Sequence, residues 1–281
     1  FLFSLQFFKY ENISSIAPIL MLQLLFVLSP RFLIYSVTAE NHMFYGALFT
    51  FSIYFGLNHF GQEHSDFPYA LLLFTVLASL TRYSALSIVF SFVLVHLFFK
   101  NTKVDWSILN KFILFFFYLF SPWLFYNYLN NGNLISGYKW QAIGTSFINY
   151  DLFEMSDYEW IFIRSFDYGS VLNIFYNHPE KFLWHVMYSS LENIEAIFFH
   201  YPPLGLFTPM VGLGFIGIFF LYDRPQWSFV LLNFFFLLII WNQSYGDYLY
   251  LLFFVSVLAV IGVNFLWLCS QKFLKYFCSI Q

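Results

Sequence analysis

Three ionisable side chains lie close together near the start of the chain, between two apolar runs: Arg31, Glu40 and His42. Moving a charged side chain into hydrocarbon costs roughly 2.5 to 3.5 kcal/mol, so such residues at a membrane boundary usually pair or line a wet cavity. We therefore predict that the segment 29–42 forms one wall of a polar site, with Arg31 as the ion-pair partner of Glu40. The alternative is an ordinary short loop in which both side chains are solvated.

A second polar cluster, Leu80-Thr81-Arg82-Tyr83-Ser84, interrupts a long apolar stretch. It predicts a tight turn between two short helices. A guanidinium at this depth needs an anionic partner, and a lipid phosphate offers bidentate geometry. The alternative partner for Arg82 is internal, either Glu40 or an acid of the segment 129–205.

A third cluster spans Ser136 to Gln141, contains Lys139 and precedes the carboxylates of Asp151, Glu154 and Asp157. This polar and aromatic set suits the binding of a sugar or a phosphate, although loops of ordinary secreted proteins have a similar composition. No metal site is predicted. His59 and His64 share a polar stretch with acids but lack a closed ligand set, and His96 in an apolar run is expected to be buried.

The overall composition places these clusters in a membrane protein. Hydrophobic residues make up 60% of the 281 residues, charged residues only 10%, and there are 44 phenylalanines. No soluble domain of this length could bury so much apolar surface, so we expect membrane lipid to surround the chain. The net charge of −3 is small and scattered, which argues against a nucleic-acid partner. The two cysteines, Cys269 and Cys278, are expected to be free thiols.

Apolar runs near the length of a spanning helix predict an all-α, polytopic membrane protein with about eight transmembrane helices. They cover approximately residues 13–29, 42–58, 67–81, 83–99, 109–128, 206–222, 227–242 and 248–269. Three parts follow: N-terminal membrane helices over 1–128, one larger external segment over 129–205, and C-terminal membrane helices with a cytoplasmic tail over 206–281.

Lysine and arginine in the short loops place both ends of the chain in the cytoplasm, and an inverted topology is the alternative. In the external segment, Asn177-His178-Pro179-Glu180 predicts a helix start. Helical spacing then makes an interfacial amphipathic helix the expectation, with Phe182, Val186, Ser190, Ile194 and Phe198 on one face. In the run 206–222, Gly212, Gly214 and Gly217 predict a close helix-packing face.

Three short motifs occur in a fixed order along the chain. The first is a proline-terminated helix and a turn, from Ser29-Pro30 through Tyr35-Ser36 to Glu40; the second is the turn Leu80 to Tyr83; the third runs from Pro122 to Asn133. Together they resemble the multispanning GT-C class of glycosyltransferases that use polyprenyl-phosphate sugars. The pattern is similar to that of the dolichyl-phosphate-mannose protein mannosyltransferases and the aminoarabinose lipid A transferases, and it covers most of the chain.

The resemblance implies a multi-pass enzyme of a bacterial inner membrane or an ER-type membrane. It would transfer a sugar, in one inverting step, from a polyprenyl phosphate to a lipid, glycan or protein acceptor on the external face. The second acidic position of the family's site falls on Glu40, which would orient the acceptor or hold a divalent cation. A divalent cation is therefore the one cofactor that the resemblance allows. Phosphate binding falls on Arg82, with Lys139 and Arg31 as further members of the substrate-binding set.

Two features depart from the family pattern. The first external loop of the family, with its catalytic acid, would precede Phe1, so we expect further residues upstream. Gly246-Asp247-Tyr248 stands where related sequences often have an Arg-Tyr pair. The alternative functions are an enzyme like the O-antigen ligases or polymerases and a non-enzymatic transporter or channel subunit, although a transporter should show pseudo-repeated halves and the sequence shows none.

Overall fold

The computed structural model describes residues 42–62, 66–99, 105–131, 175–195, 207–238 and 248–280, and every regular element in these ranges is a helix. The all-α prediction is confirmed for these residues. In chain order the elements are α4 (His42–Phe60), α5 (Tyr69–Thr81), the 3₁₀ turn η1 (Tyr83–Ala85), α6 (Leu86–Leu94), the π-helical turn η2 (Val95–Phe99), α7 (Trp106–Asn131), α11 (Pro179–Glu195), α12 (Phe207–Leu221), α13 (Arg224–Phe236) and α14 (Tyr248–Ile280).

Two of these helices contain a segment long and apolar enough to cross a membrane: Trp106–Asn130 in α7 and Phe254–Phe273 in α14. Three further apolar segments, Tyr69–Thr81, Tyr83–Phe99 and Pro209–Leu221, are shorter. The described helices thus indicate association with a membrane, whereas the number of spans stays a prediction. The first expected run, 13–29, lies outside the described residues.

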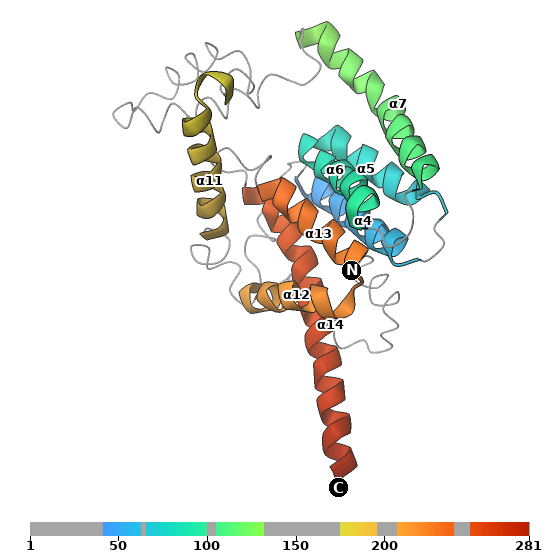
Figure 1. The fold of residues 1–281 in the computed structure, drawn as a ribbon, viewed down its shortest axis with the longest axis vertical. Helices are drawn as coiled ribbons and strands as arrows, with labels where there is room; N and C mark the ends of the chain where they lie inside the picture. Colours follow the sequence, from blue (N-terminus) through green and yellow to red (C-terminus); the bar gives the residue numbers. More distant parts are fainter. Residues whose placement is uncertain are drawn as a thin grey trace.

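The helices α4, α5, α6 and α13 lie together in the middle of the molecule (Figure 1). The green helix α7 runs along one side of this group, the olive helix α11 lies on the other, and the C-terminal half of α14 extends beyond the remaining helices (Figure 1). The most extensive contact between any two described helices joins α12 to α14.

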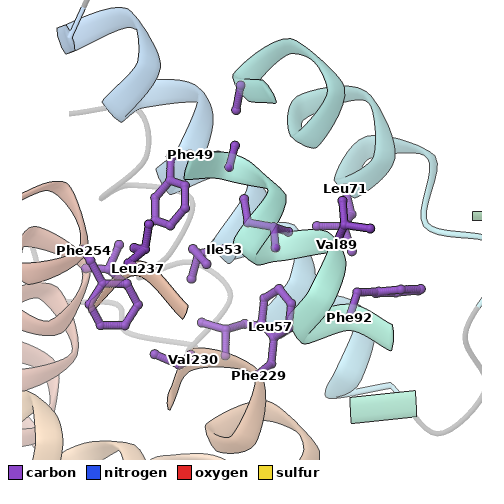
Figure 2. Close-up of a cluster of buried hydrophobic side chains, with 14 of the residues drawn as sticks. Phe49, Ile53, Leu57, Leu71, Val89, Phe92, Phe229, Val230, Leu237 and Phe254 are labelled. Atoms are coloured by element: carbon purple, nitrogen blue, oxygen red, sulfur yellow. The ribbon is translucent and has the colours of Figure 1, made fainter. Parts of the chain in front are cut away.

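Side chains of α4 lie at the centre of the buried core. Phe49, Ile53 and Leu57 follow one another at four-residue spacing, which places them on a single helix face. Figure 2 shows them between the side chains of α13, such as Val230, and those of α5 and α6, such as Val89. This apolar face of α4 therefore packs against α13 on one side and against α5 and α6 on the other.

Local sequence signals explain where two of the helices begin. One carboxylate oxygen of Asp105 accepts the backbone N–H groups of Ser107 (3.0 Å) and Ile108 (3.1 Å), which caps the start of α7. At the start of α13, the side chain of Gln226 accepts the backbone N–H of Asp223 at 3.0 Å. These contacts satisfy backbone donors that have no partner within the helix.

Pro122 lies inside α7 without ending it. Proline has no N–H to donate to the carbonyl four residues earlier, which here belongs to Tyr118. The hydroxyl of Ser121 donates to that carbonyl at 2.8 Å instead. A neighbouring serine thus supplies the missing hydrogen bond, as hydrocarbon surroundings would require.

The predicted amphipathic helix of the external segment is observed as α11, which starts at Pro179 as expected. Its predicted inner face is buried or half-buried at Phe182, Val186, Ser190 and Ile194, whereas the large apolar side chains of its opposite face are exposed. The Ser190 hydroxyl donates to the carbonyl of Leu238 at 3.2 Å, which joins α11 to the end of α13. The remaining predicted position, Phe198, lies outside the described residues.

Glycines allow α12 and α14 to approach closely. A Cβ atom on Gly214 would overlap the backbone carbonyl of Leu258, and one on Gly262 would overlap that of Met210. Gly217 similarly faces Phe265. The predicted packing face is therefore confirmed for Gly214 and Gly217 but is wrong for Gly212, because a Cβ there would meet nothing within 4 Å.

Candidate functional site

The turn between α5 and α6 carries the one predicted site residue that lies in the described residues, Arg82. Its backbone is extended (φ −152°, ψ 129°), and its N–H donates to the carbonyl of Ala78 at 2.8 Å, closing α5. The Arg82 carbonyl in turn accepts the N–H of Ala85 at 3.2 Å within η1. The side chain is half-buried. The turn predicted around Leu80–Ser84 is thus present, and it fixes the backbone from which the guanidinium extends.

Tyr83 connects this turn to the C-terminal part of α7. Its ring lies edge-on to that of Trp123, with centroids 4.7 Å apart and an interplanar angle of 69°. The side-chain amide of Asn127 donates to the Tyr83 hydroxyl at 3.2 Å. Asn127 is buried although its neighbours along the helix are exposed, because it lies on the α7 face that meets the turn.

Ser84 connects the same turn to the beginning of α4. Its hydroxyl donates to the hydroxyl of Tyr45 at 2.8 Å, and both side chains are buried. Tyr45 lies in the first turn of α4, shortly after Glu40 in sequence. The start of α4 and the turn that carries Arg82 therefore lie on the same side of the helix group.

We call the set Tyr45, Arg82, Tyr83, Ser84, Trp123 and Asn127 the Arg82 corner. It brings together the beginning of α4, the α5–α6 turn and the end of α7. Arg82 directly precedes Tyr83 and Ser84 in the chain, and the ring of Tyr83 and the hydroxyl of Ser84 make the contacts described above. A guanidinium favours phosphate as a partner, while aromatic rings and hydroxyls favour sugars. Among the described residues no group of three or more His, Cys, Asp or Glu could hold a metal ion.

The other predicted site residues, Arg31, Glu40 and Lys139, lie outside the described residues, as do Asp151, Glu154 and Asp157. Each belongs to a segment that adjoins the corner in the chain: Arg31 and Glu40 precede α4, and Lys139 follows α7. Sequence reasoning missed Tyr45 and its bond to Ser84, since a tyrosine in an apolar run gives no signal of its partner.

The histidines are arranged differently from the prediction. His59 was expected in a polar loop with His64, but it lies in α4 and is buried, and its Nε2 is 3.4 Å from the Nε2 of His96. His96 is buried, as expected. This pair lies at the other end of α4 from the Arg82 corner. The apolar neighbours of His59 could have indicated burial, whereas its pairing across 37 residues of sequence could not be foreseen.

Buried amide side chains link α13 to the helices beside it. Gln226 donates to the carbonyl of Leu57 at 2.9 Å, near the end of α4. Ser87 donates to the Asn233 amide oxygen at 3.2 Å, and the Asn233 amide nitrogen donates to the Phe229 carbonyl at 2.9 Å. These bonds position α13 and do not form a second site.

The sequence matches no protein-family model, no curated protein and no solved structure. What the chain does is therefore inferred from the geometry of the Arg82 corner and from the motifs that meet there.

Proposed function

We propose that the chain is part of a multi-pass membrane glycosyltransferase that transfers a sugar from a polyprenyl phosphate to an acceptor on the external face of the membrane. One observation carries this proposal. Two of the three motifs that resemble the GT-C class contact each other in space, because Tyr83 of the second motif meets Trp123 and Asn127 of the third. The hydrogen bond from Ser84 to Tyr45 also connects the second motif to α4, the helix that follows the first motif.

In this proposal Arg82 binds the phosphate of the donor. The phosphate leaves with an added negative charge as the sugar is transferred, and a fixed guanidinium stabilises that charge without reorganisation. Glu40 and Arg31 precede α4 in the chain, and Lys139 follows α7. Glu40 would orient the acceptor, or hold a divalent cation that does so, and the acceptor would attack the anomeric carbon from the face opposite the phosphate.

The experiment compares Arg82→Gln with Arg224→Gln in the full chain. Arg224 is the control because it is also an arginine next to a short connection between two helices, as the first residue of α13. It lies away from the Arg82 corner, since Gln226 of the same helix turn donates to Leu57 near the other end of α4. Purified protein in lipid vesicles is supplied with a panel of polyprenyl-phosphate sugars, and released polyprenyl phosphate is measured.

Arg82→Gln should lower transfer by about 10²- to 10³-fold, the scale for removing one donor to a developing anion, while Arg224→Gln should not. Both variants are checked for folding by thermal unfolding in detergent. The proposal is wrong if the folded Arg82→Gln protein transfers sugar at the wild-type rate, or if the wild-type protein uses no donor of the panel.

A further inference from the structure

The two imidazoles of His59 and His96 are arranged as a pair of metal ligands would be. Their Nε2 atoms are 3.4 Å apart. Typical hydrogen bonds from N–H groups are shorter, about 2.7 to 3.2 Å. Two nitrogens bound to one tetrahedral zinc ion at about 2.0 to 2.1 Å lie about 3.3 to 3.4 Å from each other. The observed separation is long for a hydrogen bond and matches the separation of two nitrogens that share one metal ion.

A hydrogen bond to the backbone sets the tautomer of His96. Its Nδ1 lies 3.0 Å from the carbonyl oxygen of Phe92. A carbonyl can only accept, so Nδ1 carries the proton, and the neutral ring presents an unprotonated Nε2 to His59. Metal-binding histidines usually have such a bond on their other nitrogen, which fixes the ring and strengthens the ligand.

Aromatic side chains hold both rings in place. The ring of Phe92 lies 4.2 Å from that of His96 and 5.6 Å from that of His59, measured between centroids. Phe60 contacts both imidazoles, at 5.1 Å in each case, and packs on Phe229 of α13. Packed phenylalanine rings therefore surround both imidazoles.

The pair lies near the end of α4, a position that favours a cation. α4 ends at Phe60, so the last carbonyls of this helix, which carry partial negative charge, lie near the pair. Gly61 and Gln62, directly after α4, are exposed, whereas His59 and His96 themselves are buried. Water that completes the coordination of a bound ion would therefore have to enter from this end of α4.

We infer that His59 and His96 form a binding site for a divalent transition metal of the zinc class, with water completing the coordination. Imidazole nitrogen is a good ligand for such ions, whereas softer ions prefer thiolates and harder ions prefer carboxylates. The site is separate from the Arg82 corner, since the two occupy opposite ends of α4, and it does not depend on the proposed transferase activity.

The test measures Co²⁺ and Zn²⁺ binding to the purified full chain in detergent. Tetrahedral Co²⁺ gives a visible absorption band, and Zn²⁺ binding is followed by calorimetry. His59→Phe and His96→Phe keep an aromatic ring in the packed cluster. Because even the loss of an outer-shell partner lowers metal affinity about 10- to 100-fold, the loss of a ligand should cost at least that much, and the double variant should lose the visible band.

Two controls separate this site from adventitious binding. His178→Gln removes an exposed histidine ahead of α11, and Cys269→Ser removes an exposed thiol; both should leave affinity and spectrum unchanged. Thermal unfolding in a chelator shows whether each variant is folded, and added Zn²⁺ should raise the Tm of the wild type but not of the double variant. Equal binding by the wild type and a folded double variant, or no binding by the wild type, would overturn the inference.

Discussion

Replacing Gly214 by alanine tests the close packing of α12 on α14, and Gly212→Ala provides its control. A Cβ at position 214 would overlap the Leu258 carbonyl, which is backbone and cannot move aside as a flexible side chain could. A Cβ at position 212 would meet nothing within 4 Å. Both substitutions lie in the same helix, so both gain the same helix propensity of about 0.8 to 1 kcal/mol over glycine.

The difference between the two variants therefore isolates the packing cost. Inserting a methyl group into a packed interface costs about 1 to 3 kcal/mol. Gly212→Ala should stabilise the protein by up to about 1 kcal/mol, whereas Gly214→Ala should be less stable than Gly212→Ala by about 1 to 3 kcal/mol. Gly262→Ala, which meets the Met210 carbonyl, should behave like Gly214→Ala.

Reversible unfolding of the purified protein in mixed micelles, followed by circular dichroism, measures these free energies. The reasoning fails if Gly214→Ala and Gly212→Ala are equally stable, since the contact between α12 and α14 would then tolerate a methyl group. A Gly262→Ala protein that is more stable than the wild type would also contradict the reasoning, because Gly262 lies on the α14 side of the same contact.

Three further predictions concern stability, topology and chemistry. Asn264 is fully buried, and neither its amide nitrogen nor its amide oxygen has a hydrogen-bond partner among the described residues. Asn264→Leu should therefore stabilise the protein by about 1 to 3 kcal/mol in the same unfolding assay, and a loss of stability would contradict this prediction. Cysteine at Asn133 should react with an impermeant thiol reagent outside sealed cells and cysteine at Lys103 should not, and the reverse pattern would establish the inverted topology. In the transferase assay Glu40→Gln should lower activity about 10²-fold or more. If Glu40 only balances the charge of Arg31, Glu40→Gln should instead lower the stability of the protein, and adding Arg31→Met to it should recover much of that stability.

The helices were predictable because their signals are local. The face of α11 follows from four-residue spacing alone, and its start follows from Pro179 with an acid beside it. The turn at Arg82 follows from a polar break in an apolar stretch. Such features depend on residues a few positions apart, which hydrophobic periodicity and backbone chemistry constrain directly.

The contacts between helices were not predictable, because they depend on register. Gly212 and Gly214 are two residues apart in the same helix, yet only Gly214 meets the α14 backbone, and composition cannot distinguish them. His59 was assigned to a loop because the apolar run was taken to end just before it, whereas α4 continues to Phe60. Its partner His96 lies on a different helix, and local sequence patterns do not indicate which helices are neighbours in the fold.

The length of α14 determines how deep in a bilayer its contacts would lie. At about 1.5 Å per residue, the segment Phe254–Phe273 matches the roughly 30 Å of hydrocarbon, so in a membrane Gly262 would sit close to mid-depth. Gly262 is one of the positions where α14 meets the backbone of α12, and the contact between these two helices is the most extensive among the described helices. Because a spanning helix adjusts its tilt to bilayer thickness, lipids of different chain length would move α12 and α14 together as one unit.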